Sequence, residues 1–497
     1  MAKQGAVNTD FAKGGQFRLF PQFDPTAVPQ YFGCAQMDGA EQSLGDPTIE
    51  MCPSSTTPNT WDIVDSTPTA PELGSANIAQ KMDLYLRDKW WDIKRQACEF
   101  PLYLTMGKCN KPDNFDSWES MIVISGARLT SFGLDGTLNP STGGDNATIS
   151  LTLPISFKEW YPIRPISFQE YGDATVLADI LDGLYYDVVN CGTCDVPSDG
   201  TKRLYFLAQA NSGSPGLSSQ VIRTINGGST WAAIDIPVLG GTSANRLLAM
   251  GGRLMVLSQN LGGYAWSDFT DVDAGTVNWT AVTSGFVAGK APRAGYVGSS
   301  FEAFIAAAGG YVYFVGNAGD APTRTLTDGS LSTQNLNDIH GVARTIVAVG
   351  DSNVVLRSYN NGDSFSLVVG PAVGVNLTCV WVKDRNFYIV GTGNGKVFRT
   401  TDGGVTWTQL SVPQFSVIND IRFYDDFIGY MSVEVSGGAR VYRTTNGGVT
   451  WDYQTRIKGL PTAQRINVVV PNPFDPNVLA IGGRKTIGGD GLIAVAR

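Results

Sequence analysis

The stretch Arg399–Trp407 reads RTTDGGVTW, and three close copies of it occur elsewhere in the chain. They are Arg223–Trp231 (RTINGGSTW), Arg357–Phe365 (RSYNNGDSF) and Arg443–Trp451 (RTTNGGVTW). In the last three copies along the chain, the central Asn or Asp residues lie 42 and 44 residues apart. That spacing is about the length of one four-stranded propeller blade. The repeat therefore predicts a β-propeller in the second part of the chain.

Each copy has the sequence of a hairpin turn. An apolar run ends in the Arg, and a short segment suited to a strand follows the closing Trp or Phe. An Asn or Asp side chain can bond to the backbone just after it, and Gly supplies the positive φ that such a turn needs. We expect the closing aromatic residue to plug the apolar layer beneath the turn. With two weaker copies included, the residues assigned to these turns are Asn226, Trp231, Asp268, Asp328, Asn360, Phe365, Asp402, Trp407, Asn446 and Trp451.

The copies resemble the Asp-box, also called the BNR repeat, of sialidases, sortilin-type receptors and photosystem II assembly-factor propellers. The runs Gly391–Arg399 and Ile346–Asp351 are most similar to the assembly-factor type. The resemblance covers roughly Phe168–Arg497 and implies a propeller fold. It implies no particular activity, because these repeats stabilise turns on the outside of the ring.

The copies and the strands after them predict seven blades, with six or eight as alternatives. The final blade lacks an obvious outer strand. The segment Pro165–Glu170 can supply that strand and close the ring, which removes the exposed sheet edges. We therefore assign residues 166–497 to the propeller and residues 1–165 to a separate assembly domain.

Residues 1–165 contain no copy of the repeat and predict a β-sandwich with one short helix and an extended arm. Pro and Thr are dense between Cys52 and Pro71, which is typical of an extended loop or arm. Asp88 can cap a short helix. The principal strands expected in this domain are Phe100–Met106, Met121–Phe132 and Ala147–Phe157.

The N-terminal pattern resembles the tube subunits of phage tails. The residues that carry this resemblance are Trp91–Leu104 and Gly144–Leu151, within roughly Gln22–Ser167. The resemblance implies a ring, commonly a hexamer, that stacks into a hollow tube with the propeller displayed outside. Partners would be other copies of the chain and other virion proteins, with DNA passing through the tube. The chain would be located in the virion tail and made in the host cytoplasm, consistent with a start that shows no apolar signal segment.

Composition excludes several classes of partner. The formal net charge is −9 and only 16 % of residues are charged, so no broad phosphate-binding surface is expected and sequence-specific nucleic-acid binding is disfavoured. No apolar stretch approaches the roughly 18 residues that a membrane span requires. We therefore expect neither sequence-specific nucleic-acid binding nor a membrane partner.

Cysteine and histidine usage predicts no metal and no cofactor. His340 is the single histidine, and we expect it to lie at the surface or to be partly packed. Cys191 and Cys194 form a C-x-x-C pair in a Gly- and Asp-rich loop, which favours a loop-closing disulfide or free thiols over a redox or zinc site.

Three functions fit these patterns. The first is a non-enzymatic virion structural protein, a tail tube subunit. The second is a propeller that binds a host-surface glycan or protein, on a capsid or baseplate decoration protein. The third, a sialidase-like glycoside hydrolase, needs three arginines that converge on a carboxylate. Arg357, Arg399 and Arg443 instead repeat at one position of successive blades, so we expect no catalytic residues.

Overall fold

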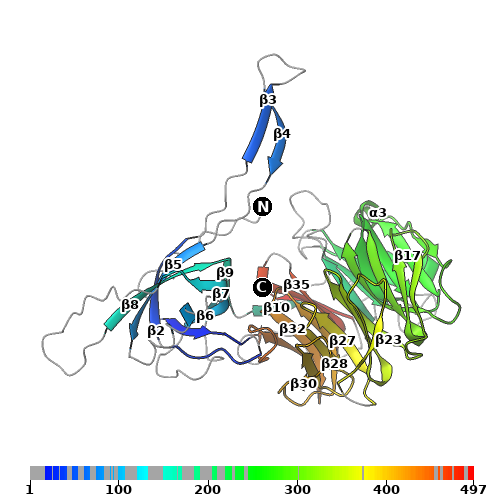
Figure 1. Cartoon of the computed structure of the whole chain (residues 1–497). Coiled ribbons are helices and arrows are strands. Elements are labelled where there is room, and N and C mark those ends of the chain that lie inside the picture. The colour runs from blue at the N-terminus through cyan, green and yellow to red at the C-terminus, as the bar shows by residue number, and fades with distance from the viewer. Residues whose placement is uncertain are drawn as a thin grey trace. The chain divides into compact units, whose positions relative to one another are not determined.

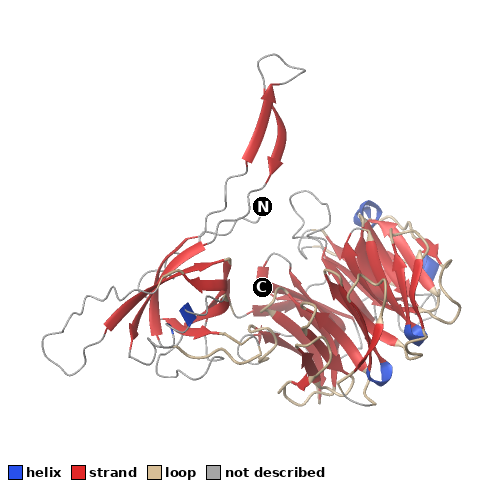
Figure 2. Cartoon of the chain, in the orientation of Figure 1, coloured by secondary structure: helices blue, strands red, loops and turns tan. Residues whose placement is uncertain are grey.

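The chain divides into two compact units, residues 2–164 and 165–497, and each is described by itself. Strands dominate both units, as Figure 2 shows. Among the described residues, no helix is long and apolar enough to cross a membrane. The computed structural model describes residues 17–24, 26–32, 34–41, 48–53, 61–67, 74–82, 90, 93–94, 99–106, 120–131, 149–164, 166–170, 184–190, 204–209, 219–225, 230–239, 244–299, 301–371, 374–452, 457–458, 463–472, 475–485 and 491–496.

The N-terminal unit contains one sheet that closes on itself. Its strands are β1 (Phe17–Pro21), β2 (Cys34–Glu41), β5 (Gly74–Met82), β6 (Phe100–Met106), β7 (Ser120–Leu129), β8 (Ile149–Phe157) and β9 (Glu159–Ile163). β1 pairs with β2, β2 with β5, β5 with β8, β8 with β7, β7 with β6, and β6 again with β1. The expected all-β domain is confirmed, and the sandwich is refined to a rolled sheet without a free edge among these six strands.

Alternation along the strands fills the barrel. Leu153, Ile155 and Phe157 of β8 are all at most 1 % exposed, as the period of two requires. Trp90, which is helical and 0 % exposed, packs edge-to-face on Phe32 with ring centroids 5.2 Å apart. The short helix is therefore part of the core.

A two-stranded hairpin overlaps the segment expected to be an arm (Figure 1). β3 (Thr48–Pro53) and β4 (Trp61–Thr67) pair antiparallel with each other and with no other strand that the structure describes. Since a two-stranded sheet is marginal on its own in water, this hairpin needs another surface for stability.

The C-terminal unit is a seven-bladed propeller, as expected. Most blades are four-stranded antiparallel meanders, and in the sixth the fourth strand is reduced in the described residues to a bridge between Arg443 and Asp452. The first blade contains β11 (Leu184–Asn190), β12 (Leu204–Gln209), β13 (Gln220–Thr224) and β14 (Ala232–Asp235); the second contains β15 (Ala244–Met250), β16 (Arg253–Ser258), β17 (Gly263–Asp268) and β18 (Thr280–Val282); and the third contains β19 (Pro292–Ser299), β20 (Glu302–Ala307), β21 (Tyr311–Val315) and β22 (Arg324–Asp328). The fourth blade contains β23 (Leu336–Val342), β24 (Thr345–Gly350), β25 (Val354–Ser358) and β26 (Ser366–Val369), and the fifth contains β27 (Leu377–Val382), β28 (Tyr388–Thr392), β29 (Val397–Thr400) and β30 (Thr408–Gln409). The sixth blade contains β31 (Val417–Phe423), β32 (Gly429–Val435) and β33 (Gly438–Thr444), and the seventh contains β35 (Ala463–Asn472), β36 (Asp475–Lys485), β37 (Gly491–Ala496) and β10 (Ile166–Glu170).

The ring closes through β10, which precedes every other strand of the propeller in the sequence. β10 pairs antiparallel with β37, so residue Phe168 lies opposite Ala496, and the short strand β34 (Ile457–Lys458) flanks β10 on its other side. The expectation that Pro165–Glu170 supplies the missing outer strand is confirmed. Packing closes the ring as well, because Phe206 of the first blade and Ile493 of the seventh belong to one buried apolar cluster.

The first strands of the seven blades are neighbours around the propeller axis. Each contacts the first strand of the next blade, and β35 contacts β11 to complete the circuit. We call these seven strands the inner ring, and the end at which they begin its starting end. The hairpins between second and third strands lie at that same end, whereas the repeat turns lie at the opposite end.

Candidate functional site

The repeat turn of the fifth blade is held by a closed set of hydrogen bonds. Asp402 Oδ1 accepts hydrogen bonds from the Thr406 backbone N–H and the Thr400 hydroxyl, both at 2.8 Å. The Thr400 oxygen in turn accepts the Gly404 N–H at 2.8 Å. The backbone reverses through Gly403 and Gly404, whose φ values are 73° and 89°. The hydrogen bonds from Thr406 lower the pKa of Asp402 to about 2.

The same geometry recurs with Asn in place of Asp. Asn446 Oδ1 accepts the Thr450 N–H and the Thr444 hydroxyl, each at 3.0 Å, and its Nδ2 donates to the Thr450 hydroxyl at 2.9 Å. Asn360 makes the equivalent bonds to Ser358 and Ser364 in the fourth blade. The change from Asp to Asn therefore keeps the turn and reverses one side-chain hydrogen bond, because the amide Nδ2 donates to the hydroxyl where a carboxylate oxygen accepts from it.

The two weaker copies have different structures. Asp328 does not lie in a turn between third and fourth strands, which corrects the sequence assignment: it ends β22, the outer strand of its blade. The corresponding turn there connects β21 to β22 and contains Asn317, whose Nδ2 donates to Asp320. Asp268 has the expected position, but the short helix α3 (Phe269–Ala274) follows it, and its carboxylate pairs with Arg253 at 2.9 Å. Asn226, Cys191 and Cys194 lie outside the described residues.

The closing aromatic residues pack between blades. Trp407 Nε1 donates to the carbonyl of Val369 on the outer strand of the preceding blade, at 2.9 Å. Trp231 and Trp451 pack against Phe206 and Phe423, and Phe365 packs on the cluster between the third and fourth blades. Each closing aromatic residue therefore packs against an apolar layer, which agrees with the expectation that it fills the layer beneath its turn.

Two of the arginines that open the copies, Arg357 and Arg443, bind the next blade and not a common centre. Arg357 donates to the carbonyl of Gly403, in the repeat turn of the fifth blade. Arg443 Nη2 lies 3.3 Å from the Pro476 carbonyl and 3.3 Å from Asn477 Oδ1, both in the seventh blade. These contacts follow the circumference of the propeller, so Arg357 and Arg443 do not converge on one centre.

A second repeated feature, a β-bulge with a hydrogen bond to the next blade, occurs in the inner ring. In each of its seven strands, the register against the second strand shifts, as a β-bulge requires. In four blades the residue at this shift donates to the carbonyl of the residue that directly precedes the shift in the next inner strand. These hydrogen bonds run from Asn245 to Pro292 (2.9 Å), from Asn337 to Leu377 (3.0 Å), from Thr378 to Ile418 (2.6 Å) and from Asn419 to Ile466 (3.0 Å).

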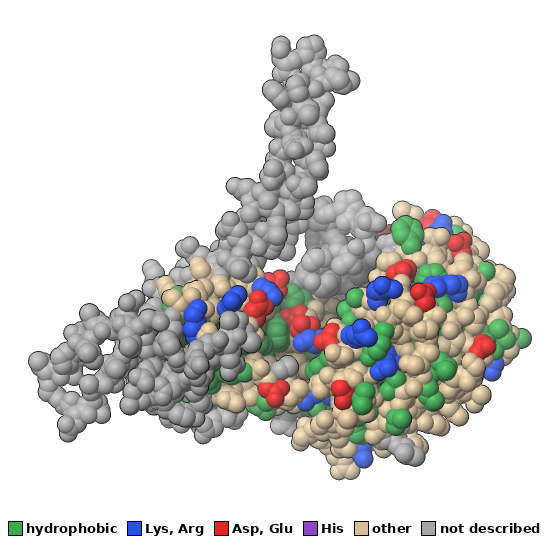
Figure 3. All heavy atoms as spheres, in the orientation of Figure 1, with side chains coloured by type: hydrophobic (Ala, Val, Ile, Leu, Met, Phe, Trp, Pro, Cys, Tyr) green, Lys and Arg blue, Asp and Glu red, His purple; other side chains and the backbone are tan. Residues whose placement is uncertain are grey.

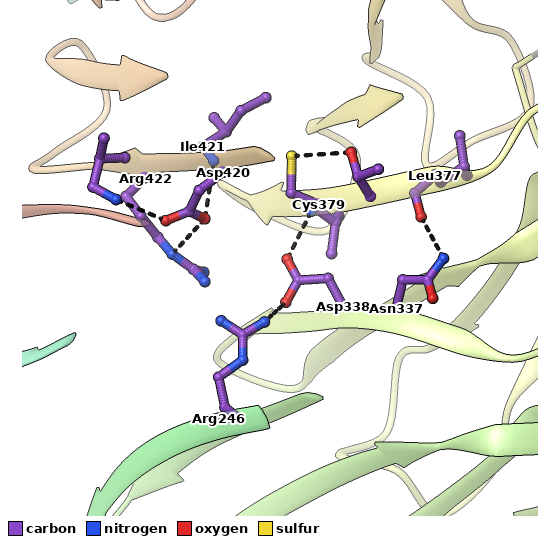
Figure 4. Close-up of polar contacts among 11 residues, drawn as sticks. Arg246, Asn337, Asp338, Leu377, Cys379, Asp420, Ile421 and Arg422 are labelled. Carbon is purple, nitrogen blue, oxygen red and sulfur yellow. Dashed lines mark hydrogen bonds and ion pairs between the residues drawn. The ribbon is translucent and has the colours of Figure 1, made fainter. Parts of the chain in front are cut away.

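Two buried carboxylates follow directly after these residues (Figure 4). Asp338 accepts the Val380 N–H of the next blade at 2.9 Å, and Asp420 accepts the Val469 N–H at 3.1 Å. Asp338 also pairs with Arg246 at 2.6 Å, and Asp420 with Arg422 on its own strand at 3.1 Å. Each carboxylate therefore connects neighbouring blades and is neutralised by a guanidinium.

His340 and Cys379 are packed beside these pairs and are poorly suited to acid–base or nucleophilic chemistry. His340 is partly exposed, as expected, and its Nδ1 accepts the Val382 N–H at 3.1 Å. Burial and the nearby Arg422 lower its pKa to about 3, so the ring is neutral near pH 7. Burial raises the pKa of the Cys379 thiol.

The inner-ring bonds were not anticipated from the sequence. A signal for them exists, because an apolar residue followed by Asn starts four of the bulged segments: Ala244–Asn245, Leu336–Asn337, Ile418–Asn419 and Ile466–Asn467. The serine and threonine hydroxyls of the repeat turns were also not singled out, although each accepts backbone N–H groups.

Comparison with known proteins finds structural neighbours but no family. No protein-family model and no curated protein matches the chain. Several solved propellers are similar in structure. YCF48 from Cyanidioschyzon merolae is 14 % identical, with a TM-score of 0.48 over 66 % of this chain and 98 % of that one. The RRP9 WD40 repeats are 11 % identical, with a TM-score of 0.47 over 66 % and 97 %. Virginiamycin B lyase from Staphylococcus aureus is 12 % identical, with a TM-score of 0.49 over 67 % and 99 %. At these identities the likeness concerns the fold.

Proposed function

We propose that this chain is a non-enzymatic virion structural protein, a tail tube subunit whose N-terminal domain assembles into rings and whose propeller is a contact module. The observation that carries the proposal is the hairpin β3–β4 in a unit whose sheet is otherwise closed. A closed barrel offers few edges for pairing, so this hairpin is the element suited to joining another copy. The sequence resemblance to tail tube subunits, described above, supports the same role.

The propeller supports a structural role in a different way. Two inner-ring carboxylates, Asp338 and Asp420, are each occupied by a guanidinium and a backbone N–H, and His340 is neutral near pH 7. Acidic and basic side chains are interspersed on the face visible in Figure 3. These features favour shape and contact over bond-making chemistry.

Negative-stain microscopy of the purified full chain tests this proposal. We expect rings or stacked tubes, with a hexamer as the expected ring. A matched variant replaces residues 48–67 with a short Gly-Ser turn. It should keep its β-rich circular dichroism and melting transition but lose the rings. Monodisperse single particles from the unaltered chain would contradict the assembly role.

A second candidate is a propeller that binds a host-surface ligand. It is favoured by two cations, Lys290 and Arg293, at the starting end of the inner ring. Neither makes an ion pair with an acidic residue in the described part of the chain. A glycan and protein array probed with the full chain tests this candidate, and specific binding would support it.

A further inference from the structure

The bulged position of the third blade departs from the pattern of the others. Where four blades place Asn or Thr, which donates to the next inner strand, this blade places Arg293. Its Nη2 donates to Asn337 Oδ1 at 3.1 Å, and its Nε is buried without a partner among the described atoms. A largely buried cation with only a neutral acceptor is costly unless another charge compensates it.

The amide of Asn337 is fixed by its other bonds. Its Nδ2 donates both to Asp351 Oδ1 at 2.8 Å and to the Leu377 carbonyl at 3.0 Å. The oxygen must therefore face Arg293, and it offers the guanidinium one neutral acceptor. The nearest carboxylate in this network, Asp351, is occupied by two amides, because Asn335 Nδ2 also donates to it at 3.1 Å.

A second cation lies at the other end of the same network. Asn335 Oδ1 accepts the Gly309 N–H at 3.2 Å, and a side chain added at Gly309 would collide with Lys290 Nζ. Lys290 faces the ring of Tyr311 at 5.2 Å. A continuous chain of contacts thus runs from Lys290 through Gly309, Asn335, Asp351 and Asn337 to Arg293. Lys290 and Arg293 carry two positive charges, whereas Asp351 carries the one negative charge of this chain of contacts.

The turn that follows Asp351 is strained. Ser352 and Asn353 adopt φ values of 54° and 68°, where the equivalent hairpin of the third blade uses Gly309 and Gly310. Non-glycine residues held in this region are costly and cluster at functional sites. The Ser352 N–H is held by Asn376 Oδ1 of the fifth blade at 3.0 Å.

We propose that this end of the third and fourth blades binds an oxyanion, a carboxylate or a sulfate carried by an external ligand. The Arg293 guanidinium can bind such a group end-on, through Nη1 and the second N–H of Nη2, and Lys290 adds a second charge. The inference rests on the second candidate function and specifies its ligand chemistry.

The test is calorimetric titration of the full chain with sodium glucuronate, with sodium sulfate and, as the uncharged match, with glucose. Glucuronate, sulfate or both should bind and glucose should not. Which of the two anions binds shows whether the site takes a carboxylate or a sulfate. Arg293→Gln keeps a donor for Asn337 but removes the charge. It should weaken anion binding about tenfold or more, whereas Arg293→Lys should keep part of it.

Arg344→Gln is the matched control, because Arg344 is exposed beyond the opposite end of β23. It should leave the affinity unchanged. The melting temperature of ligand-free Arg293→Gln should equal or exceed that of the unaltered chain, because an uncompensated cation is removed. A lower melting temperature with unchanged anion binding would show that Arg293 is structural and would overturn the inference. Binding of neutral array glycans that Arg293→Gln does not alter would also overturn it, while leaving the binding function intact.

Discussion

Arg246 of the second blade and Asp338 of the fourth form a 2.6 Å ion pair whose side chains are only 12 % and 2 % exposed. The pair joins two blades that are not adjacent, since the third blade lies between them in the ring. Because Asp338 also accepts the Val380 N–H, one carboxylate connects three blades.

Removing one member of this pair should be costly. Arg246→Met leaves a buried carboxylate without its cation, and we expect a loss of about 3 kcal/mol in the free energy of unfolding. The double variant Arg246→Met/Asp338→Asn should regain much of that loss, because Asn can still accept the Val380 N–H. Denaturant unfolding of the single and double variants measures the coupling. Additive losses would contradict this interpretation.

The repeat turns should depend on their hydroxyl groups. Thr444 is 1 % exposed, and its oxygen accepts the Gly448 N–H at 2.9 Å. Thr444→Val keeps the shape but leaves that N–H unpaired, so we expect a loss of about 1–3 kcal/mol. Thr444→Ser keeps the oxygen and serves as the control. Equal stabilities of the two variants by thermal denaturation would exclude the hydroxyl as the holding group.

Acid should weaken the turn of the fifth blade more than that of the sixth. The pKa of Asp402 is lowered to about 2, so its hydrogen bonds contribute stability above its unfolded pKa of about 4. That contribution is lost as the pH falls from about 4 through 2. Asp402→Asn, which copies the arrangement at Asn446, should remove this dependence. The effect should stay below about 1 kcal/mol because the turn is exposed. Melting temperatures of both proteins between pH 2 and pH 6 check it, and parallel curves would argue against it.

The sequence patterns that depend on local chemistry were sufficient for much of the fold. The repeat around Asp402 located the blades, and the absence of a last outer strand located β10, because a propeller must close. Asp328 was misplaced because Thr-Asp-Gly is also a natural end for an outer strand, and the triplet alone does not say which strand it follows.

The inner ring was harder to predict for a physical reason. A β-bulge redirects a side chain without changing the apolar alternation around it, so the role of Asn337 depends on a neighbouring blade and not on its own segment. Likewise, the alternation of apolar residues in the N-terminal unit specifies a buried face. It does not distinguish two packed sheets from one rolled sheet.

Closure of the ring by β10 gives a further prediction. A protease site inserted after Arg164 leaves β10 attached to the propeller, so cleavage there should not alter the melting temperature of the propeller. Cleavage at a site inserted after Glu170 separates β10 from the blades that follow it. We expect the melting temperature to fall by at least about 5 °C, because the strand beside β37 can then dissociate. Equal melting temperatures after the two cuts would mean that β10 is dispensable.

The most direct test of the structural role is the mass of the native particle. Sedimentation of the full chain at several concentrations should show a species of several 53.2 kDa chains, with a hexamer as the expected unit. A single species of 53.2 kDa at every concentration would contradict the proposed assembly.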